Sequence, residues 1–234
     1  MEEMVHANGN MPEIWFAGDC HGEFAHILNA TDHRTPDAII FLGDLDCRGP
    51  LQSELRDLQA NIEVAYIPGN HDSDSESNWD NLTNSGFINL HSSVATIRGV
   101  RIAGLGGVFR KPWNPRADVA VDPLLSGSAY AKTLGKGNLF RGGLPLRHLT
   151  TIFPADVFYL SQQSADVLVT HEAPGLHEFG FEVITHLAQC LGVQRAFHGH
   201  LHESICYLRS PWMGVGFRSI VSLGGEVIHI GGEY

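Results

Sequence analysis

Apolar residues along the chain gather in short runs, and glycine, proline, aspartate or asparagine bounds each run. Runs of this kind are typical of buried strands. The runs that predict strands lie at 14–18, 38–43, 62–69, 94–107, 166–170 and 193–199. The stretches between several of them predict helices, at 23–30, 50–60, 76–84, 154–163 and 180–190. This alternation favours an α/β fold whose strands are buried and largely parallel.

The pattern changes between residues 203 and 230, where closely spaced strand patterns are separated by turns that contain glycine. Such spacing is typical of antiparallel pairing. We therefore expect a mixed α/β (α+β) arrangement, in which antiparallel strands lie beside or opposite the first sheet.

Residues 108–150, called the cap segment below, are rich in glycine and proline and show no regular period. A loop of this length inside a compact domain is usually functional or disordered. We interpret it as a cap inserted into a single domain that spans residues 1–234. Trp113 within it either stacks on a base or anchors the loop.

Positive charge is concentrated in the cap segment. Seven of the 15 lysines and arginines lie between 110 and 147 with two acidic residues, so this stretch carries +5 in a chain of net charge −11. We expect the cap to steer an anionic substrate, with Arg110, Arg116 and Arg141 as its main contacts. A solvated loop without a specific role is the alternative.

Composition excludes several other classes of protein. The net charge of −11 argues against stable nucleic-acid binding, which needs a basic face. No apolar run approaches the roughly 20 residues of a membrane-spanning helix, and the start of the chain lacks the parts of a signal peptide, so we expect a cytoplasmic protein. The four cysteines form no CxxC pair and are expected to be free thiols. No feature favours a particular oligomeric state.

Metal-ligating residue types follow five of the predicted strands. They are Asp19 and His21, Asp44, Asn70 and His71, His171, and His200 and His202. Ligands gather beyond the carboxyl ends of strands in open α/β sheets, so we expect these side chains to converge. Taken singly, each could equally be a turn former or a helix cap.

The residue types indicate which ions such a site would take. Asp, Asn and His without Cys suit divalent ions of intermediate hardness, with Mn as the first choice and Fe, Zn, Ni or Co as alternatives. One aspartate can bridge two ions about 3.5 to 4 Å apart, and a water between them would lose its proton near neutral pH. The sequence therefore predicts a site for two divalent or trivalent metal ions.

Three residues near the predicted ligands have competing interpretations. His198 points opposite to its neighbours on a strand, which favours a structural hydrogen bond over ligation, and Cys20 is expected to be a small buried residue. His177 either reaches the site from the loop after His171 or lies exposed at the surface.

Five motifs in order resemble the calcineurin-like metallophosphoesterase superfamily. They are GDCHG (18–22), GDLDCRG (43–49), GNHD (69–72), THE (170–172) and GHLH (199–202). The resemblance implies two facing mixed β-sheets flanked by helices, an αββα sandwich. It also implies hydrolysis of a phosphomonoester or phosphodiester by in-line attack of a metal-bridging hydroxide.

The resemblance further implies roles for individual residues. Asp19, His21 and His202 would hold the first metal ion and Asn70, His171 and His200 the second, with Asp44 bridging the two. His71 would protonate or hydrogen-bond the leaving oxygen, and Arg48 would bind the non-bridging phosphate oxygens.

The second motif departs from the pattern of the protein-phosphatase and diadenosine-tetraphosphatase branch. The protein phosphatases place an aspartate before the arginine to orient the catalytic histidine, whereas here that position is Cys47. Asp46 or Asp72 is expected to orient His71 instead. The GHLH motif looks more like the phosphodiesterase-type branches.

Because the motifs mix branches, the substrate class stays open. It could be a phosphoprotein, a nucleotide or a dinucleoside polyphosphate, hence a small molecule or a phosphopeptide. A binding scaffold of the same fold that has no turnover is the alternative function.

Overall fold

A computed structural model describes residues 11–117 and 120–232 of the chain. The chain start considered above for a signal peptide (1–10) and residues 118–119 of the cap segment lie outside the described residues. The helices are Ala25–His33 (α1), Leu51–Glu54 (α2), Glu76–Thr83 (α3), Gly127–Ala131 (α4), Pro154–Leu160 (α5) and Glu182–Leu191 (α6), with the 3-10 helices His71–Ser73 (η1), Lys136–Asn138 (η2) and Leu146–Thr150 (η3). None of these helices is long and apolar enough to cross a bilayer.

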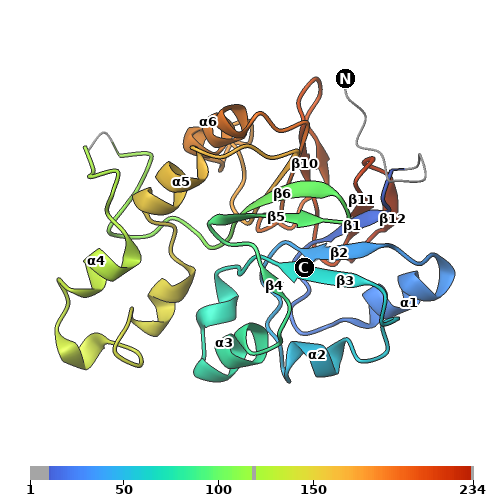
Figure 1. Ribbon diagram of the computed structural model, residues 1–234, viewed down its shortest axis with the longest axis horizontal. Helices are drawn as coiled ribbons and strands as arrows, with labels where there is room; N and C mark the ends of the chain where they lie inside the picture. The colour runs from blue at the N-terminus through green and yellow to red at the C-terminus, as the bar shows by residue number, and fades with distance from the viewer. Residues whose placement is uncertain (1–10, 118–119, 233–234) are drawn as a thin grey trace.

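The strands form two six-stranded sheets (Figure 1). The first has the order β12-β11-β1-β2-β3-β4, with strands Val227–His229, Ile220–Ser222, Ile14–Ala17, Ala38–Phe41, Glu63–Tyr66 and Ile88–Asn89. The second has the order β5-β6-β7-β8-β10-β9, with strands Ser93–Ile97, Val100–Leu105, Val167–Thr170, Arg195–His198, Trp212–Gly214 and Ile205–Cys206. Both contain parallel and antiparallel pairs, which confirms the mixed α/β fold class.

Alternation along the strands builds three apolar layers. In β1, Ile14 and Phe16 join the cluster between the two sheets, whereas Trp15 and Ala17 join the cluster that α1 and α3 cover. A third cluster packs α5 and α6 on the outer face of the second sheet. Successive side chains of a strand point to opposite faces, so strands buried on both sides read as continuous apolar runs.

The register of the parallel strands brings the candidate site residues together. Strands β1, β2 and β3 are parallel neighbours, and so are β7 and β8. Their carboxyl ends therefore lie at a common edge of each sheet. The loops that leave these ends carry all five groups of metal-ligating residue types.

Some sequence expectations need correction. The run at 94–107 is a hairpin of β5 and β6, whose turn has Arg98 and Gly99 at positive φ. The helix expected at 50–60 is the short α2, followed by turns. Strand β10 escaped prediction, and it pairs parallel to β8 rather than antiparallel. The carboxyl-terminal strands divide between both sheets, since β9 and β10 join the second sheet while β11 and β12 join the first.

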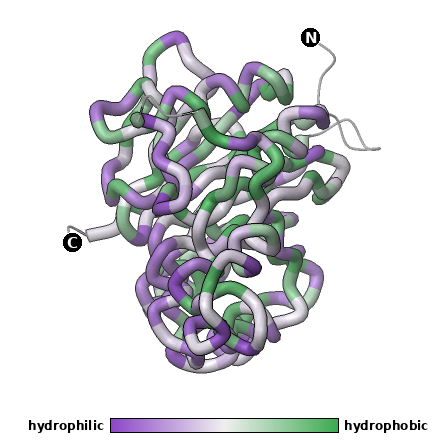
Figure 2. The backbone as a smooth tube through the Cα atoms, turned by 90° about the vertical axis from the view of Figure 1, so that its left-hand side faces the viewer, coloured by the Kyte–Doolittle hydropathy of each residue, from purple (hydrophilic) through white to green (hydrophobic). Residues whose placement is uncertain are grey.

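The cap segment lies beside the second sheet and contains α4, η2 and η3 (Figure 1). The side of the molecule that carries the cap segment faces the viewer in Figure 2, and its loops mix hydrophilic and hydrophobic residues. This mixture is consistent with the lack of a regular period in the sequence of the cap segment. Trp113 is buried in the cluster of the second sheet, and its ring packs edge-on against Phe109 at 5.0 Å between centroids. Trp113 therefore anchors the loop.

The contact between the sheets centres on Phe16 of β1 and Phe197 of β8, whose rings stack with centroids 3.9 Å apart. Replacing Phe16 with alanine (Phe16→Ala) leaves a cavity between the sheets, so we expect the free energy of unfolding to fall by about 3 to 5 kcal/mol. Urea denaturation measures this change. Phe158→Ala, on an exposed helix face, is the matched control and is expected to stay within about 0.5 kcal/mol of the parent. Equal losses in both variants would contradict the central role of the stacked pair.

Candidate metal centre

Two groups of three side chains offer ligand atoms at metal-binding distance from one another. The first is Asp19, His21 and His202, and the second is Asp44, His171 and His200. Within each group the ligand atoms all lie within 4.8 Å of one another. The structure thus brings together six of the seven residues expected to hold metal, and the seventh, Asn70, contacts the second group.

In the first group two histidines face each other through their Nε2 atoms, which are 3.3 Å apart. The other ring nitrogen of His21, Nδ1, lies 2.8 Å from Oδ2 of Asp46. This pairing assigns the proton to Nδ1 and leaves the Nε2 lone pair directed at the site, the usual arrangement for a metal-binding histidine. Asp46 therefore orients a metal ligand.

In the second group the imidazole of His171 is buried and fixed by the backbone. Its Nδ1 donates to the carbonyl oxygen of Leu42 at 2.8 Å, and its Nε2 lies 3.3 Å from Oδ2 of Asp44 and 3.2 Å from Oδ1 of Asn70. Three potential ligand atoms from three different strand ends thus converge. A cation bound there would satisfy all of them.

The two groups lie next to each other. Both carboxylate oxygens of Asp19 accept the backbone N–H of His200, at 3.1 and 3.0 Å, and Oδ1 of Asp19 is 3.9 Å from Nδ1 of His171. Asp19 therefore contacts residues of the second group while belonging to the first. This adjacency fits a pair of ions.

The charge balance of the site also fits cations. Asp19 and Asp44 are buried, and across 11–117 and 120–232 no lysine or arginine forms an ion pair with either of them. Burial raises the pKa of Asp19 to about 7. Burial opposes the charge of His171 as well, but the neighbouring carboxylates, led by Asp44, raise the pKa of this imidazole to about 10. Buried carboxylates need a positive partner, and metal ions supply it.

Unusual backbone geometry places these side chains. Six residues of the loops have positive φ, namely Asp19 (27°), His21 (43°), Asp44 (48°), Asp46 (49°), His200 (69°) and His202 (58°). Such conformations cost roughly 1 to 3 kcal/mol each for residues other than glycine and gather at functional sites. Asp and His tolerate this region better than most residues.

His71 stands beside the first group, with its ring centroid 5.4 Å from that of His21. Its Nδ1 is hydrogen-bonded to Oδ2 of Asp74 at 2.7 Å. The two expected partners have other contacts. Asp46 is hydrogen-bonded to His21 and Asn78. Asp72 is buried and accepts the backbone N–H groups of Asp46 and Gly69. Asp74 therefore replaces Asp46 and Asp72 as the residue that orients His71.

Arg48 is exposed, and its Nη1 lies 3.3 Å from a carboxylate oxygen of Glu23. Its Nε would be 2.9 Å from a Cβ at Gly22, so the side chain lies over the loop that carries His21. A role for Arg48 in binding phosphate stays a prediction.

Arg110 and Arg147 of the cap segment line a pocket of about 420 Å³ beside the metal centre, together with Asn70, His71, Ser73, Asp74 and Leu146. Nη1 of Arg110 donates to the backbone carbonyls of Arg147 and Thr150 and to the hydroxyl of Thr150. Burial and the charge of Arg147 lower the pKa of Arg110. The guanidinium of Arg110 is thus held beside Arg147, whose own side chain is exposed.

The other basic residues expected to bind substrate have different partners. Arg141 forms ion pairs with Asp80 and Glu76 of α3, so it fastens the cap segment to that helix. Arg116 donates to the carbonyls of Phe179 and Gly180 and lies over the ring of Phe181 at 4.3 Å. Neither lines this pocket, and contact of either residue with substrate stays a prediction.

His177 and His198 both have structural surroundings. Nε2 of His177 lies 3.6 Å from Glu203, and its Nδ1 accepts the N–H of Phe179. His177 is thus largely covered, neither directed at the ligand groups nor fully exposed. His198 is buried, and its Nε2 is hydrogen-bonded to the hydroxyl of Tyr207 at 2.9 Å.

The four cysteines are free, and Cys20 and Cys47 are buried in the apolar cluster under α1. Burial raises the pKa of both thiols above the ordinary range. These two therefore act as small apolar residues beside the site.

The sequence patterns did not single out Asp74, Arg147 or Glu172 as functional residues. Asp74 follows GNHD closely, so its spacing from His71 was a usable signal. Glu172 belongs to the THE motif; it is buried, accepts the N–H of Phe109, and lies 3.8 Å from Nε2 of His200. Burial raises the pKa of Glu172 to about 7.

The two mixed sheets and the two ligand groups match the fold and ligand pattern of the calcineurin-like phosphoesterase family. The family model for calcineurin-like phosphoesterases matches residues 12–204, and the chain belongs to this family. An uncharacterized protein of Haemophilus influenzae is 42% identical over 222 residues, which cover 92% of this chain and 96% of the relative. The crystal structure of TT1561 from Thermus thermophilus superposes with a TM-score of 0.60 at 15% identity, covering 93% of this chain and 97% of that chain, and supports the fold.

Gly69 offers a test of the second ligand group, because a Cβ at this position would lie 2.2 Å from both the amide nitrogen and Oδ1 of Asp44. Gly69→Ala is expected to displace this carboxylate and to weaken metal binding by about 10- to 100-fold. Competition with a chromophoric chelator measures the affinity, and circular dichroism checks that the variant is folded. Gly137→Ala, where nothing lies within 4 Å, is the control. A folded Gly69→Ala protein with parental affinity would remove Asp44 from the ligand set.

Proposed function

We propose that the protein is a metal-dependent phosphoesterase that hydrolyses a phosphomonoester or phosphodiester. The observation that carries the proposal is the adjacency of two ligand groups built from buried carboxylates and imidazoles. Asp19, His21 and His202 would hold one ion, and Asn70, His171 and His200 the other, with Asp44 shared. Two such ions supply a water of lowered pKa and neutralise charge on the phosphate.

The residues around the ions have roles that follow from their contacts. Asp46 and the carbonyl of Leu42 fix the ring orientations of His21 and His171, so the ligand atoms need no rearrangement when ions bind. Asp74 holds Nδ1 of His71, which leaves its Nε2 to hydrogen-bond or protonate the leaving oxygen. We propose manganese as the first metal to test, with iron, zinc, nickel and cobalt as alternatives.

Hydrolysis of p-nitrophenyl phosphate and bis-p-nitrophenyl phosphate with added Mn²⁺ tests the proposal. Asp44→Asn removes a buried negative ligand atom, so it is expected to lower metal content and to reduce kcat/KM by at least about 1000-fold. Release of p-nitrophenol gives the rate, and elemental analysis gives the metal content.

Two further variants sharpen this experiment. His71→Ala is expected to keep the metal ions but to lower kcat by about 100- to 10,000-fold, because it removes only a proton donor. Asp57→Asn, an exposed carboxylate, is the control and is expected to match the parent. If the metal-loaded protein hydrolyses no phosphoester in a broad panel, the fold serves as a binding scaffold and the enzyme proposal fails.

A further inference from the structure

The pocket between the cap segment and η1 carries positive charge without an ion-pair partner. Among the residues that the structure describes, no carboxylate forms an ion pair with Arg110 or Arg147. Other arginines do pair, for example Arg34 and Arg101 with glutamate and aspartate partners. Arg110 feels the charges of Asp74, Glu172 and Asp44, but none of these acids pairs with it directly. Two guanidinium groups without an ion-pair partner that line one pocket, in a chain of charge −11, favour binding of an anion.

The pocket is built from fixed parts. Three acceptors hold Nη1 of Arg110, and all of them belong to Arg147 and Thr150 of η3. The hydroxyl of Thr150 at the end of η3 is hydrogen-bonded to that of Ser73 in η1 at 2.7 Å, and both residues are buried. The side chain of Arg110 is therefore tied through Thr150 to the same short helix that presents His71, whereas Arg147 reaches the pocket with an exposed side chain.

The position of His71 decides which part of a substrate would reach this pocket. His71 and Asn70 line it, so it opens from the metal centre on the side where the leaving oxygen is expected. The acid in the pocket, Asp74, is already hydrogen-bonded to His71. An anionic group of the leaving fragment would therefore meet Arg110 and Arg147.

We propose that Arg110 and Arg147 form a second phosphate subsite, and that the substrate carries a further phosphoryl group on its leaving fragment. This inference rests on the proposed function. The substrate class is then an organic diphosphate or polyphosphate, such as a nucleoside polyphosphate, rather than a simple monoester. In the reaction a water oxygen bonds to phosphorus while the bond from phosphorus to the leaving oxygen breaks. The water gives up one proton to solvent, and the leaving oxygen receives a proton from His71, which regains one from solvent. The phosphate retained on the leaving fragment stays paired with the two arginines.

Calorimetric binding of orthophosphate and pyrophosphate to the manganese-loaded protein tests the subsite directly. The parent is expected to bind pyrophosphate about 10- to 100-fold more tightly than orthophosphate, because only the larger anion reaches both sites. Arg147→Gln is expected to lose most of this preference. Its backbone carbonyl still holds Arg110, and its side chain is exposed, so the variant is expected to fold.

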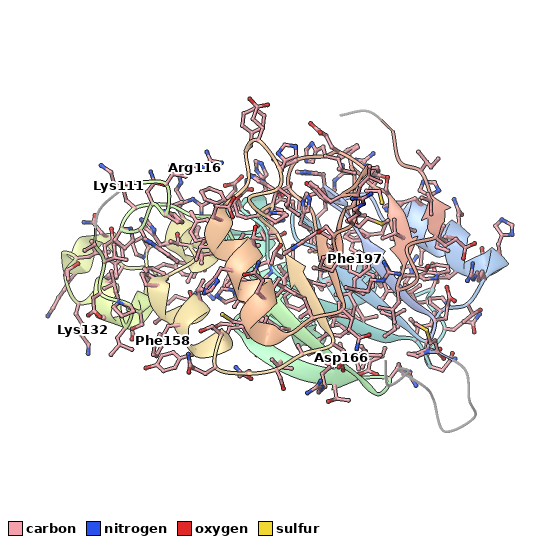
Figure 3. The ribbon with its side chains drawn as sticks, turned by 90° about the horizontal axis from the view of Figure 1, so that it is seen from above. Lys111, Arg116, Lys132, Phe158, Asp166 and Phe197 are labelled. Atoms are coloured by element: carbon pink, nitrogen blue, oxygen red, sulfur yellow. The ribbon has the colours of Figure 1, made fainter. Side chains whose placement is uncertain are left out.

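Lys132→Gln is the matched control, since it removes the same charge from the same segment. Lys132 lies at the outer end of the cap segment (Figure 3), and it is not among the residues that line the pocket. It is expected to keep the preference for pyrophosphate. Equal loss in both variants would indicate general steering by positive charge, and a preference unchanged in Arg147→Gln would overturn the subsite.

Kinetics with AMP and ADP complete the test, because removal of the terminal phosphate leaves an uncharged nucleoside in one case and a phosphorylated one in the other. Arg147→Gln is expected to reduce kcat/KM for ADP about 10-fold or more beyond its effect on kcat/KM for AMP. For each substrate the effect is the ratio of the variant's kcat/KM to the parent's, so the intrinsic reactivity of the bond cancels. If the parent hydrolyses p-nitrophenyl phosphate but Arg147→Gln lowers kcat/KM equally for AMP and ADP, the subsite is overturned and the proposed function stands. A pyrophosphate preference that depends on Arg147, without hydrolysis of any phosphoester, would instead overturn the proposed function.

Discussion

The burial of two carboxylates, Asp19 and Asp44, is the constraint on which the site depends. A desolvated carboxylate is unfavourable without a positive partner. Within the described ranges the groups that face them are imidazoles and backbone N–H groups rather than lysine or arginine. The remaining charge has to come from bound cations or from protons on the histidines. Strand register, the close approach at Gly69 and the second hydrogen bonds of His21 and His171 all serve to keep these groups in place.

The loops meet this constraint through their backbone as much as through their side chains. The residues with positive φ turn the chain sharply after β1, β2 and β8. Two ligands separated by one residue can therefore reach one group, as Asp19 and His21 do, or two adjacent groups, as His200 and His202 do. In an extended strand, alternation also puts such pairs on one side, but it would carry them roughly 7 Å apart along the chain. The tight turn shortens that separation.

The sequence predicted the ligand set because strand ends, residue type and motif order all agreed. It predicted the fold class because buried parallel strands read as continuous apolar runs. It did not predict the partners of Arg116 and Arg141, because those contacts depend on how the cap segment packs against α3 and the loop at 177–181. It offered Asp46 or Asp72 as the partner of His71, and not Asp74, for a similar reason, since only the loop conformation shows that Asp46 reaches His21 and Asp74 reaches His71. Strand β10 is short and bounded by proline and glycine, so it lacked a strand pattern.

The division of the carboxyl-terminal strands between the two sheets has a consequence for biosynthesis. β1 pairs with β11 on one side, and β8 pairs with β10, so each sheet needs strands that leave the ribosome late. A ribosome adds about 5 to 20 residues per second, so β1 waits for many seconds with one edge uncovered after it is made. During that interval the apolar edge is open to wrong strand pairing. Newly made chains of this protein therefore depend on chaperones or on rapid completion more than a fold with only local strand pairs would.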